Sequence, residues 1–113
     1  MITPQHSELS SGRWFSLSLA EQLGNVGSEV GRAINWKNKN NAEFYEKAFI
    51  RMLELMDLTL ADQRWKGFRK KELARVREAL CDSFEGGHQF GIPLADWPPY
   101  FLPFATYARA TRV

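Results

Sequence analysis

Five polar or aromatic residues recur at helical spacing in the first half of the chain and could form a polar recognition face. They are Glu21, Asn25, Glu29, Arg32 and Trp36. Tryptophan and arginine are enriched at the energetically important positions of binding sites, so this face could contact a partner. Together with His88, its carboxylates and amide could also form a small-molecule or metal site. The simpler interpretation is a solvated face with exposed ion pairs such as Glu29–Arg32, each worth about 0.2–0.5 kcal/mol.

A second stretch of chemical interest is strongly basic. Residues 64–77 hold seven Lys or Arg against one acidic residue, Glu72, which gives a local charge of +6. Such a segment could bind RNA or an acidic partner. The basic groups surround the predicted helix and do not form one stripe, so a solvated helix is the simpler expectation. The candidate nucleic-acid contacts are Arg69, Lys70, Arg75 and Arg77.

The motifs that carry metal or nucleophilic chemistry are weak or missing. Glu85 and His88 have the Glu-x-x-His spacing of di-iron bundles, but the motif occurs once and two glycines separate its residues. Cys81 falls at the edge of an apolar helical face, where a buried, inert thiol is the common case. Neither a phosphate-binding glycine loop nor a hydrolase serine motif is present. We therefore expect no catalytic residues, no metal and no cofactor.

Small residues mark another face of the same first helix. Each glycine inside a helix costs about 1 kcal/mol relative to alanine, so three of them within eight residues indicate a packing or binding role. At this spacing, small residues let another helix backbone approach closely. We expect a tight helix pair within one chain, and the alternatives are a homodimer interface or a ligand groove lined by backbone. The residues of this glycine face are Ala20, Gly24, Gly27 and Gly31.

Four amphipathic segments must position these side chains, and no segment alternates in the manner of a strand. Ser16 or Ser18 is a suitable cap for the first helix, and Asn41 for the second. Gly86 and Gly87 end the third, because glycine takes the left-handed conformation of a helix C-terminus at little cost. The predicted helices cover residues 16–39, 41–60, 68–84 and 96–109.

The fourth segment is rich in proline. Pro98 and Pro99 suit the first turn of a helix that starts at Asp96, because the missing N–H of proline is not needed there. Pro103 lies inside the same segment and is expected to bend it. Four helices with short connections predict an all-α fold, an antiparallel up-down four-helix bundle with a short, Pro-bent fourth helix.

Length and composition bound the class of protein. The chain has 113 residues, one cysteine, 44% hydrophobic residues and a net charge of +2, as in an ordinary globular domain. Residues 1–12 show no periodicity and are expected to be a flexible lead-in to a single domain over 13–113. One cysteine cannot form an intrachain disulfide and suits a reducing compartment. Because no apolar run could span a bilayer and no secretory signal is seen, we expect a cytoplasmic protein without membrane contact.

Three strings resemble a family of small, uncharacterised four-helix-bundle proteins of bacteria and archaea. They are WFSLSLAEQLGNVGSEVGRAINWKNKN at 14–40, AFIRMLELMDLTLAD at 48–62 and KELARVREALCDSF at 71–84. The resemblance implies a four-helix bundle and supplies no activity. The general shape is also similar to the bundles that include HEPN domains and the proteins of ribosomal intervening sequences. HEPN ribonucleases carry an arginine a few residues before a histidine, and the chain departs from this pattern at both His6 and His88.

These observations favour a non-enzymatic interaction module that acts as a homo-oligomer or within a larger assembly. The glycine face and an aromatic C-terminal segment are the features on which this prediction depends. One alternative is RNA binding through residues 64–77. The other is a small-molecule or metal site on the polar recognition face.

Overall fold

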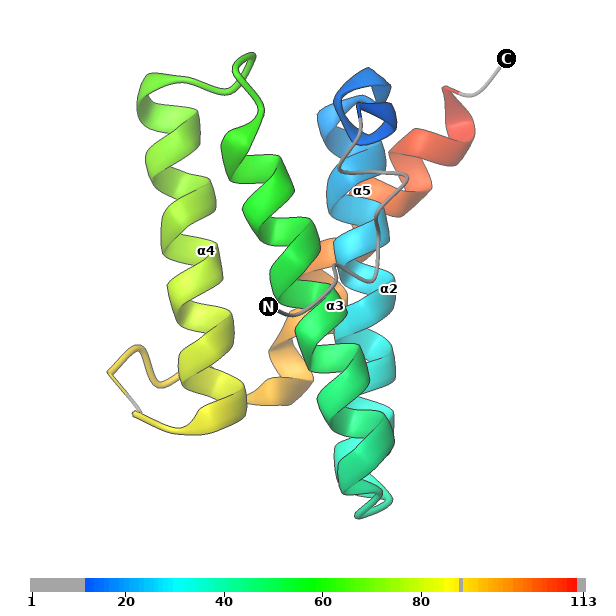
Figure 1. Cartoon of the computed structure of the whole chain (residues 1–113), viewed down its shortest axis with the longest axis vertical. Helices are drawn as coiled ribbons and strands as arrows, with labels where there is room; N and C mark the ends of the chain where they lie inside the picture. The colour runs from blue at the N-terminus through cyan, green and yellow to red at the C-terminus, as the bar shows by residue number, and fades with distance from the viewer. Residues whose placement is uncertain (1–11, 88, 112–113) are drawn as a thin grey trace.

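Four α-helices and two short 3-10 helices make up most of residues 12–87 and 89–111, the part of the chain that the structure describes (Figure 1). The structure is a computed structural model. No strand occurs in these residues, so the prediction of an all-α protein is confirmed, and none of the described helices is long and apolar enough to cross a bilayer. The elements are η1 (Arg13–Ser16), α2 (Leu19–Asn38), α3 (Ala42–Ala61), α4 (Gly67–Glu85), η2 (Leu94–Asp96) and α5 (Trp97–Ala110).

The first long helix begins later than predicted. The Ser18 Oγ accepts a hydrogen bond from the Glu21 N–H at 3.1 Å, and the Glu21 carboxylate accepts one from the Ser18 N–H at 2.9 Å. This capping box satisfies backbone N–H groups that have no partner inside the helix, and it fixes the start of α2 at Leu19. Residues 13–16 form η1, a separate turn that helical periodicity did not predict. Most of the predicted flexible lead-in, residues 1–11, lies outside the described residues.

The other helix ends follow the residues that predicted them. The Asn41 Oδ1 accepts a hydrogen bond from the Phe44 N–H at 3.1 Å and caps α3. Gly86 ends α4 with φ +76°, a left-handed conformation that costs glycine little. Pro98 and Pro99 lie in the first turn of α5, where the missing N–H groups would have no partner.

Helix α2 packs closely against both α3 and α5. In Figure 1, α4 lies beside α3. Helix α5 crosses behind α3, and the distance between α5 and α4 increases toward the C-terminal end of α5. The side chains between the helices form one apolar core, whose removal from water is the main term that favours the folded state. Core side chains that are fully buried include Val26, Val30, Ala33, Met52, Met56 and Leu80.

Large aromatic side chains lie between α3 and α4. The ring centroids of Phe49 and Phe84 are 5.7 Å apart, and the ring of Tyr45 is 5.8 Å from that of Phe49. The Tyr45 hydroxyl donates a hydrogen bond to the Glu85 carboxylate at 2.8 Å. Because these rings fill the space between the two helices, the α3 and α4 backbones approach less closely than those of α2 and α5.

The glycine face of α2 is where α5 comes close. A Cβ atom on Gly24 would lie 3.2 Å from the Ala105 Cα, and one on Gly27 would lie 2.5 Å from the Phe101 Cβ. Helix α5 therefore occupies the space that two side chains would need. Gly31 is exposed, and among the described residues no atom outside α2 lies within 4 Å of its Cβ position, so Gly31 lies beyond the contact between α2 and α5.

Ala20 and Pro103 lie elsewhere on the two helices of this pair. Ala20, which the sequence groups with the glycine face, is half-buried in the first turn of α2. Pro103 lies inside α5, and the helix continues past it to Ala110. Because proline has no N–H, it interrupts the backbone hydrogen bonds of α5 without ending the helix.

Candidate functional site

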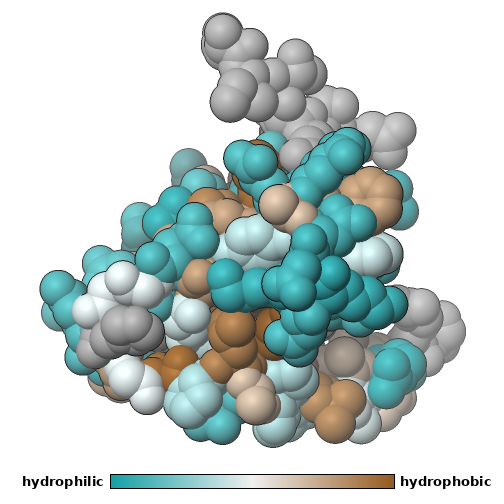
Figure 2. All heavy atoms as spheres, turned by 90° about the horizontal axis from the view of Figure 1, so that it is seen from below, coloured by the Kyte–Doolittle hydropathy of each residue, from teal (hydrophilic) through white to brown (hydrophobic). Residues whose placement is uncertain are grey.

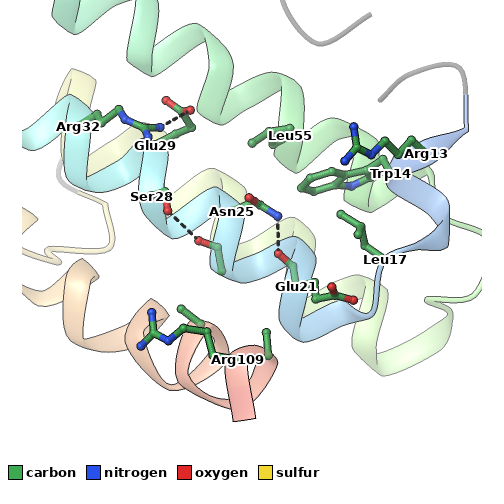
Figure 3. A pocket seen from close by; sticks show the side chains of 13 residues that line it. Arg13, Trp14, Leu17, Glu21, Asn25, Ser28, Glu29, Arg32, Leu55 and Arg109 are labelled. Carbon is green, nitrogen blue, oxygen red and sulfur yellow. Dashed lines mark hydrogen bonds and ion pairs between the residues drawn. The ribbon is translucent and has the colours of Figure 1, made fainter. Parts of the chain in front are cut away.

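A groove runs along α2 between η1 and α5 (Figure 3). Its volume is about 660 Å³, within the range of ligand-binding clefts. The groove, which we call the α2 groove, coincides with most of the polar recognition face predicted from the sequence. Four of the five residues of that face line it. They are Glu21, Asn25, Glu29 and Arg32.

Hydrogen bonds along the helix hold the polar side chains of the α2 groove. The Asn25 Nδ2 donates to the Glu21 carbonyl oxygen at 2.9 Å. The Ser28 Oγ donates to the Gly24 carbonyl oxygen at 3.3 Å. The Glu21 carboxylate is itself fixed by the capping box at the start of α2. These side chains are therefore oriented before any partner binds, which lowers the entropy cost of recognition.

Glu29 is the most buried ionisable residue of the α2 groove, with 7% of its surface exposed. Its Oε1 accepts a hydrogen bond from the Arg32 Nη1 at 2.7 Å. Its Oε2 is buried and has no hydrogen-bond partner among the residues that the structure describes. A buried acceptor without a partner costs about 1–3 kcal/mol, so a donor group that reached this oxygen would be bound favourably.

Three guanidinium groups in the α2 groove come from three different elements. Arg13 belongs to η1, Arg32 to α2 and Arg109 to α5. Figure 3 shows the Arg13 and Arg109 side chains on opposite sides of the α2 ribbon. The groove thus presents both signs of charge, and it can form ion pairs with a polar surface that carries both signs too.

Trp36, the fifth residue of the polar recognition face, lies outside the α2 groove. Its ring packs edge-on against Phe44 with centroids 4.9 Å apart, and the Lys39 Nζ lies 5.3 Å from the Trp36 ring centroid. Figure 2 views the molecule from this end of α2 and shows hydrophobic side chains gathered between hydrophilic ones. Trp36 therefore stabilises the turn between α2 and α3 and takes no part in the groove.

Part of the basic segment over 64–77 lies beside acidic side chains. The Arg77 Nε donates to the Asp57 carboxylate at 2.6 Å, and this hydrogen bond raises the pKa of Arg77. The Arg75 Nη1 lies 3.7 Å from the Glu72 carboxylate. Two of the four candidate nucleic-acid contacts are therefore next to acidic groups. The two that are exposed and have no carboxylate partner in the described structure are Arg69 and Lys70.

A buried polar network around Gln22 was not predicted from the sequence. The side chain of Gln22 is fully buried, and its Nε2 donates to the Trp14 carbonyl oxygen at 3.0 Å and to the Asp62 carboxylate at 2.9 Å. Its Oε1 accepts a hydrogen bond from the Trp65 Nε1 at 2.8 Å. The Trp14 Nε1 in turn donates to the Thr59 Oγ1 at 3.1 Å. One amide thus connects η1, α2 and the connection between α3 and α4.

Arg64 completes this network at its acidic member, Asp62. The Arg64 Nη2 lies 2.7 Å from the Asp62 Oδ2 and also donates to the Leu17 carbonyl oxygen at 2.6 Å. The hydrogen bonds from Arg64 lower the pKa of Asp62 to about 2, although burial opposes this shift. The one sequence signal for the network is Gln22 itself, a polar residue within the apolar stripe of the first helix.

Stability is expected to fall as the pH is lowered from about 4 to about 2. The folded pKa of Asp62 is about 2, below its ordinary value of 3.8, so the unfolded chain binds this proton more readily than the folded chain. The contribution of Asp62 is therefore complete above the ordinary pKa and is lost as the pH falls through the folded pKa. Urea unfolding across this range measures it, and Asp62→Asn should flatten the pH dependence. The same pH dependence in both proteins would rule Asp62 out as its cause.

The remaining candidate groups lie apart from the α2 groove. Cys81 in α4 is half-buried, and desolvation raises the pKa of its thiol, which favours the uncharged form. Within residues 12–87 and 89–111, no group of three or more His, Cys, Asp or Glu is placed to hold a metal ion. His6 and His88 lie outside the described residues, and His88 is the histidine of both the Glu-x-x-His motif and the predicted small-molecule or metal site.

No protein-family model, curated protein or solved structure matches the chain. The resemblance to small bacterial and archaeal bundles, and the looser similarity to HEPN domains, stay predictions. The α2 groove brings together most of the polar recognition face that the sequence singles out.

Proposed function

We propose that this chain is a non-enzymatic interaction module that forms a homodimer through the α2 groove. The observation that carries the proposal is that two carboxylates and three guanidinium groups share one hollow. In a two-fold symmetric interface both copies use the same patch, so the patch must offer partners for its own charges. A groove with both signs of charge meets this requirement, whereas a groove of one sign would repel its copy.

The acidic groups of the α2 groove are held by hydrogen bonds within the chain, which favours a role in binding over a role in catalysis. Glu21 completes the capping box of α2, and Glu29 pairs with Arg32 at 2.7 Å. A general acid or base has to exchange its proton during the reaction, and these structural bonds oppose such exchange. The second oxygen of Glu29 is buried and has no partner within the described chain, so Glu29 would gain a hydrogen bond if its side chain turned outward toward a guanidinium or amide of the second copy.

The fold proposed for this module is an antiparallel up-down bundle in which Pro103 bends α5. The short connections support this arrangement, because only residues 39–41 separate α2 from α3 and residues 62–66 separate α3 from α4. The hydrogen bond that Pro103 cannot make supports the bend. A reducing cytoplasm is the compartment proposed for the module, since its one cysteine cannot form a disulfide within the chain.

The mass of the full chain in solution tests the proposed homodimer. Sedimentation equilibrium is expected to show a species of about 26 kDa, twice the 13.0 kDa of one chain. Arg109→Glu should raise the dimer Kd about tenfold, because it removes a cation from the groove and adds a like charge opposite its carboxylates. Lys70→Glu, an exposed charge reversal on α4, is the matched control and should leave the Kd unchanged. A chain that stays monomeric at millimolar concentration, or an Arg109→Glu variant that dimerises normally, contradicts the proposal.

A further inference from the structure

A second groove lies between α2, α4 and α5 and differs from the α2 groove in its chemistry. Its volume is about 560 Å³, and it shares no lining residue with the α2 groove. It forms because α5 leans away from α4, which leaves the first half of α4 without a close neighbour on that side (Figure 1). Apolar side chains of all three helices make the floor of this α4 groove: Leu19, Leu23, Leu73, Tyr100 and Phe104.

The most exposed large hydrophobic residue of the described chain lies at this groove. Phe68, in the first turn of α4, is 82% exposed and lines the α4 groove. An aromatic side chain in water gives up the favourable free energy of burial. Single exposed apolar residues are ordinary, but one that extends a concave apolar floor makes a larger patch of the kind that binds a partner.

Positive charge forms the rim of the α4 groove. Arg64, Lys66 and Arg69 line it together with one carboxylate, that of Glu72. Lys66 is also the N-cap residue of α4, its side chain makes no capping hydrogen bond, and the first turn holds no acidic residue. The helix dipole adds positive potential at the same place. This end of α4 therefore lacks the negative charge that stabilises a helix N-terminus.

We propose that the α4 groove docks an acidic, amphipathic helical segment of a partner protein. The apolar face of that helix would cover the leucine and aromatic floor together with Phe68, as helices do in hydrophobic grooves. Its acidic residues would meet Lys66, Arg69 and the uncapped start of α4. A single bound helix would thus bury the exposed Phe68 ring and would place negative charge beside both the basic rim and the start of α4.

Other anionic occupants fit the α4 groove less well. Nucleic-acid bases stack on open aromatic faces, whereas this floor is concave and partly aliphatic. A bilayer is entered by a protruding apolar surface, and here most of the apolar side chains lie at the bottom of a hollow. The basic side chain of Arg64 is also already bound to Asp62 at 2.7 Å, which reduces the charge available to a polyanion.

Fluorescence anisotropy of a labelled synthetic peptide, titrated with the full chain, tests this docking site. The probe is a peptide of about 18 residues, five helical turns, with Leu at i, i+3, i+4 and i+7 spacing and Glu elsewhere. The same peptide with Lys in place of Glu is its matched control. We expect micromolar binding of the acidic peptide that weakens as salt is added, and at least tenfold weaker binding of the basic one.

Variants of exposed residues locate the binding surface without disturbing the core. Phe68→Ala should raise the peptide Kd about tenfold, whereas Leu102→Ala, which truncates a 59% exposed side chain outside the groove, should leave it unchanged. Reversing Lys66 and Arg69 together to Glu should weaken binding about tenfold and slow association. Arg109→Glu should bind the peptide normally, so a failure of the homodimer and a failure of this site are distinguishable.

Four results would overturn the proposal. The first is no binding of the acidic peptide, and the second is equal binding of the acidic and basic peptides. The third is an unchanged Kd in Phe68→Ala. The fourth is tighter binding of single-stranded oligouridine or phosphatidylserine vesicles than of the acidic peptide, which would assign the basic rim to RNA or to lipid.

Discussion

Replacing Gln22 by alanine is expected to lower the free energy of unfolding by about 3 kcal/mol. The buried amide donates to the Trp14 carbonyl oxygen and to Asp62, and it accepts from the Trp65 indole. Truncation removes three hydrogen bonds at once, and each polar group left unpaired away from water costs about 1–3 kcal/mol. The cavity adds to this cost. Urea unfolding followed by circular dichroism measures the change.

Two further variants separate the hydrogen bonds of Gln22 from its volume. Asn25→Ala removes a side-chain amide from the same helix, but Asn25 is exposed and its one bond is local, so the change should stay within about 0.5 kcal/mol. Gln22→Met keeps a similar volume and should still cost about 2 kcal/mol, because the Trp65 indole N–H loses its acceptor while Asp62 and the Trp14 carbonyl oxygen each lose a donor. Equal effects of Gln22→Ala and Asn25→Ala would mean that the network does not determine stability.

Gly27→Ala is expected to destabilise the protein by about 1–2 kcal/mol, although alanine favours a helix by about 1 kcal/mol over glycine. The new Cβ would lie 2.5 Å from the Phe101 Cβ, a separation that real Cβ atoms essentially never show. The Phe101 Cβ is joined directly to the backbone and cannot swing aside, so α5 has to shift. Such overpacking costs about 1–3 kcal/mol and outweighs the gain in helix propensity.

Gly31→Ala is the matched control for this substitution. It makes the same chemical change one turn further along α2, at a position where no described atom outside α2 lies within 4 Å of the new Cβ. Only the helix propensity changes there, so this variant should gain about 0.5–1 kcal/mol. Thermal unfolding of the two variants should therefore move in opposite directions. A rise in Tm for both would show that α5 does not press on α2 at Gly27.

The helices could be predicted from the sequence because the signals that start and end them act within one turn. Ser18 and Asn41 accept hydrogen bonds from residues three positions later, and Gly86 turns the chain at its own φ. Each of these interactions is contained in a few neighbouring residues, so their types and spacing are sufficient. The same reasoning gave the apolar stripes, since periodicity shows which side of a helix is buried.

The buried polar network could not be predicted because its members lie far apart in the sequence. Gln22 is 40 residues from Asp62 and 43 from Trp65. Periodicity indicates that a helix face is buried, but it does not indicate which connection folds over that face. Residues 61–67 therefore looked like a plain loop, whereas Asp62 is 3% exposed and anchors the chain between α3 and α4.

The candidate site could be predicted only in part, because some of its residues come from elements that lie far apart in the sequence. Arg13 and Arg109 join the α2 groove from other elements, and their position depends on how η1 and α5 pack against α2. Trp36 does not line the groove, because the turn after α2 places Phe44 against its ring. Helical spacing alone can group only the groove residues that belong to one continuous helix. These residues are Glu21, Asn25, Glu29 and Arg32.

The network around Gln22 also allows the folded chain to be followed by its own tryptophan fluorescence. Two of its four tryptophans belong to the network, because the Trp14 indole donates to Thr59 and the Trp65 indole donates to Gln22. The wavelength of indole emission depends on the polarity of its surroundings and on the hydrogen bond at its nitrogen. Release of η1 or of the connection between α3 and α4 would hydrate an indole and shift its emission to the red. Local opening at this end of the molecule can thus be followed by intrinsic fluorescence, with no added dye.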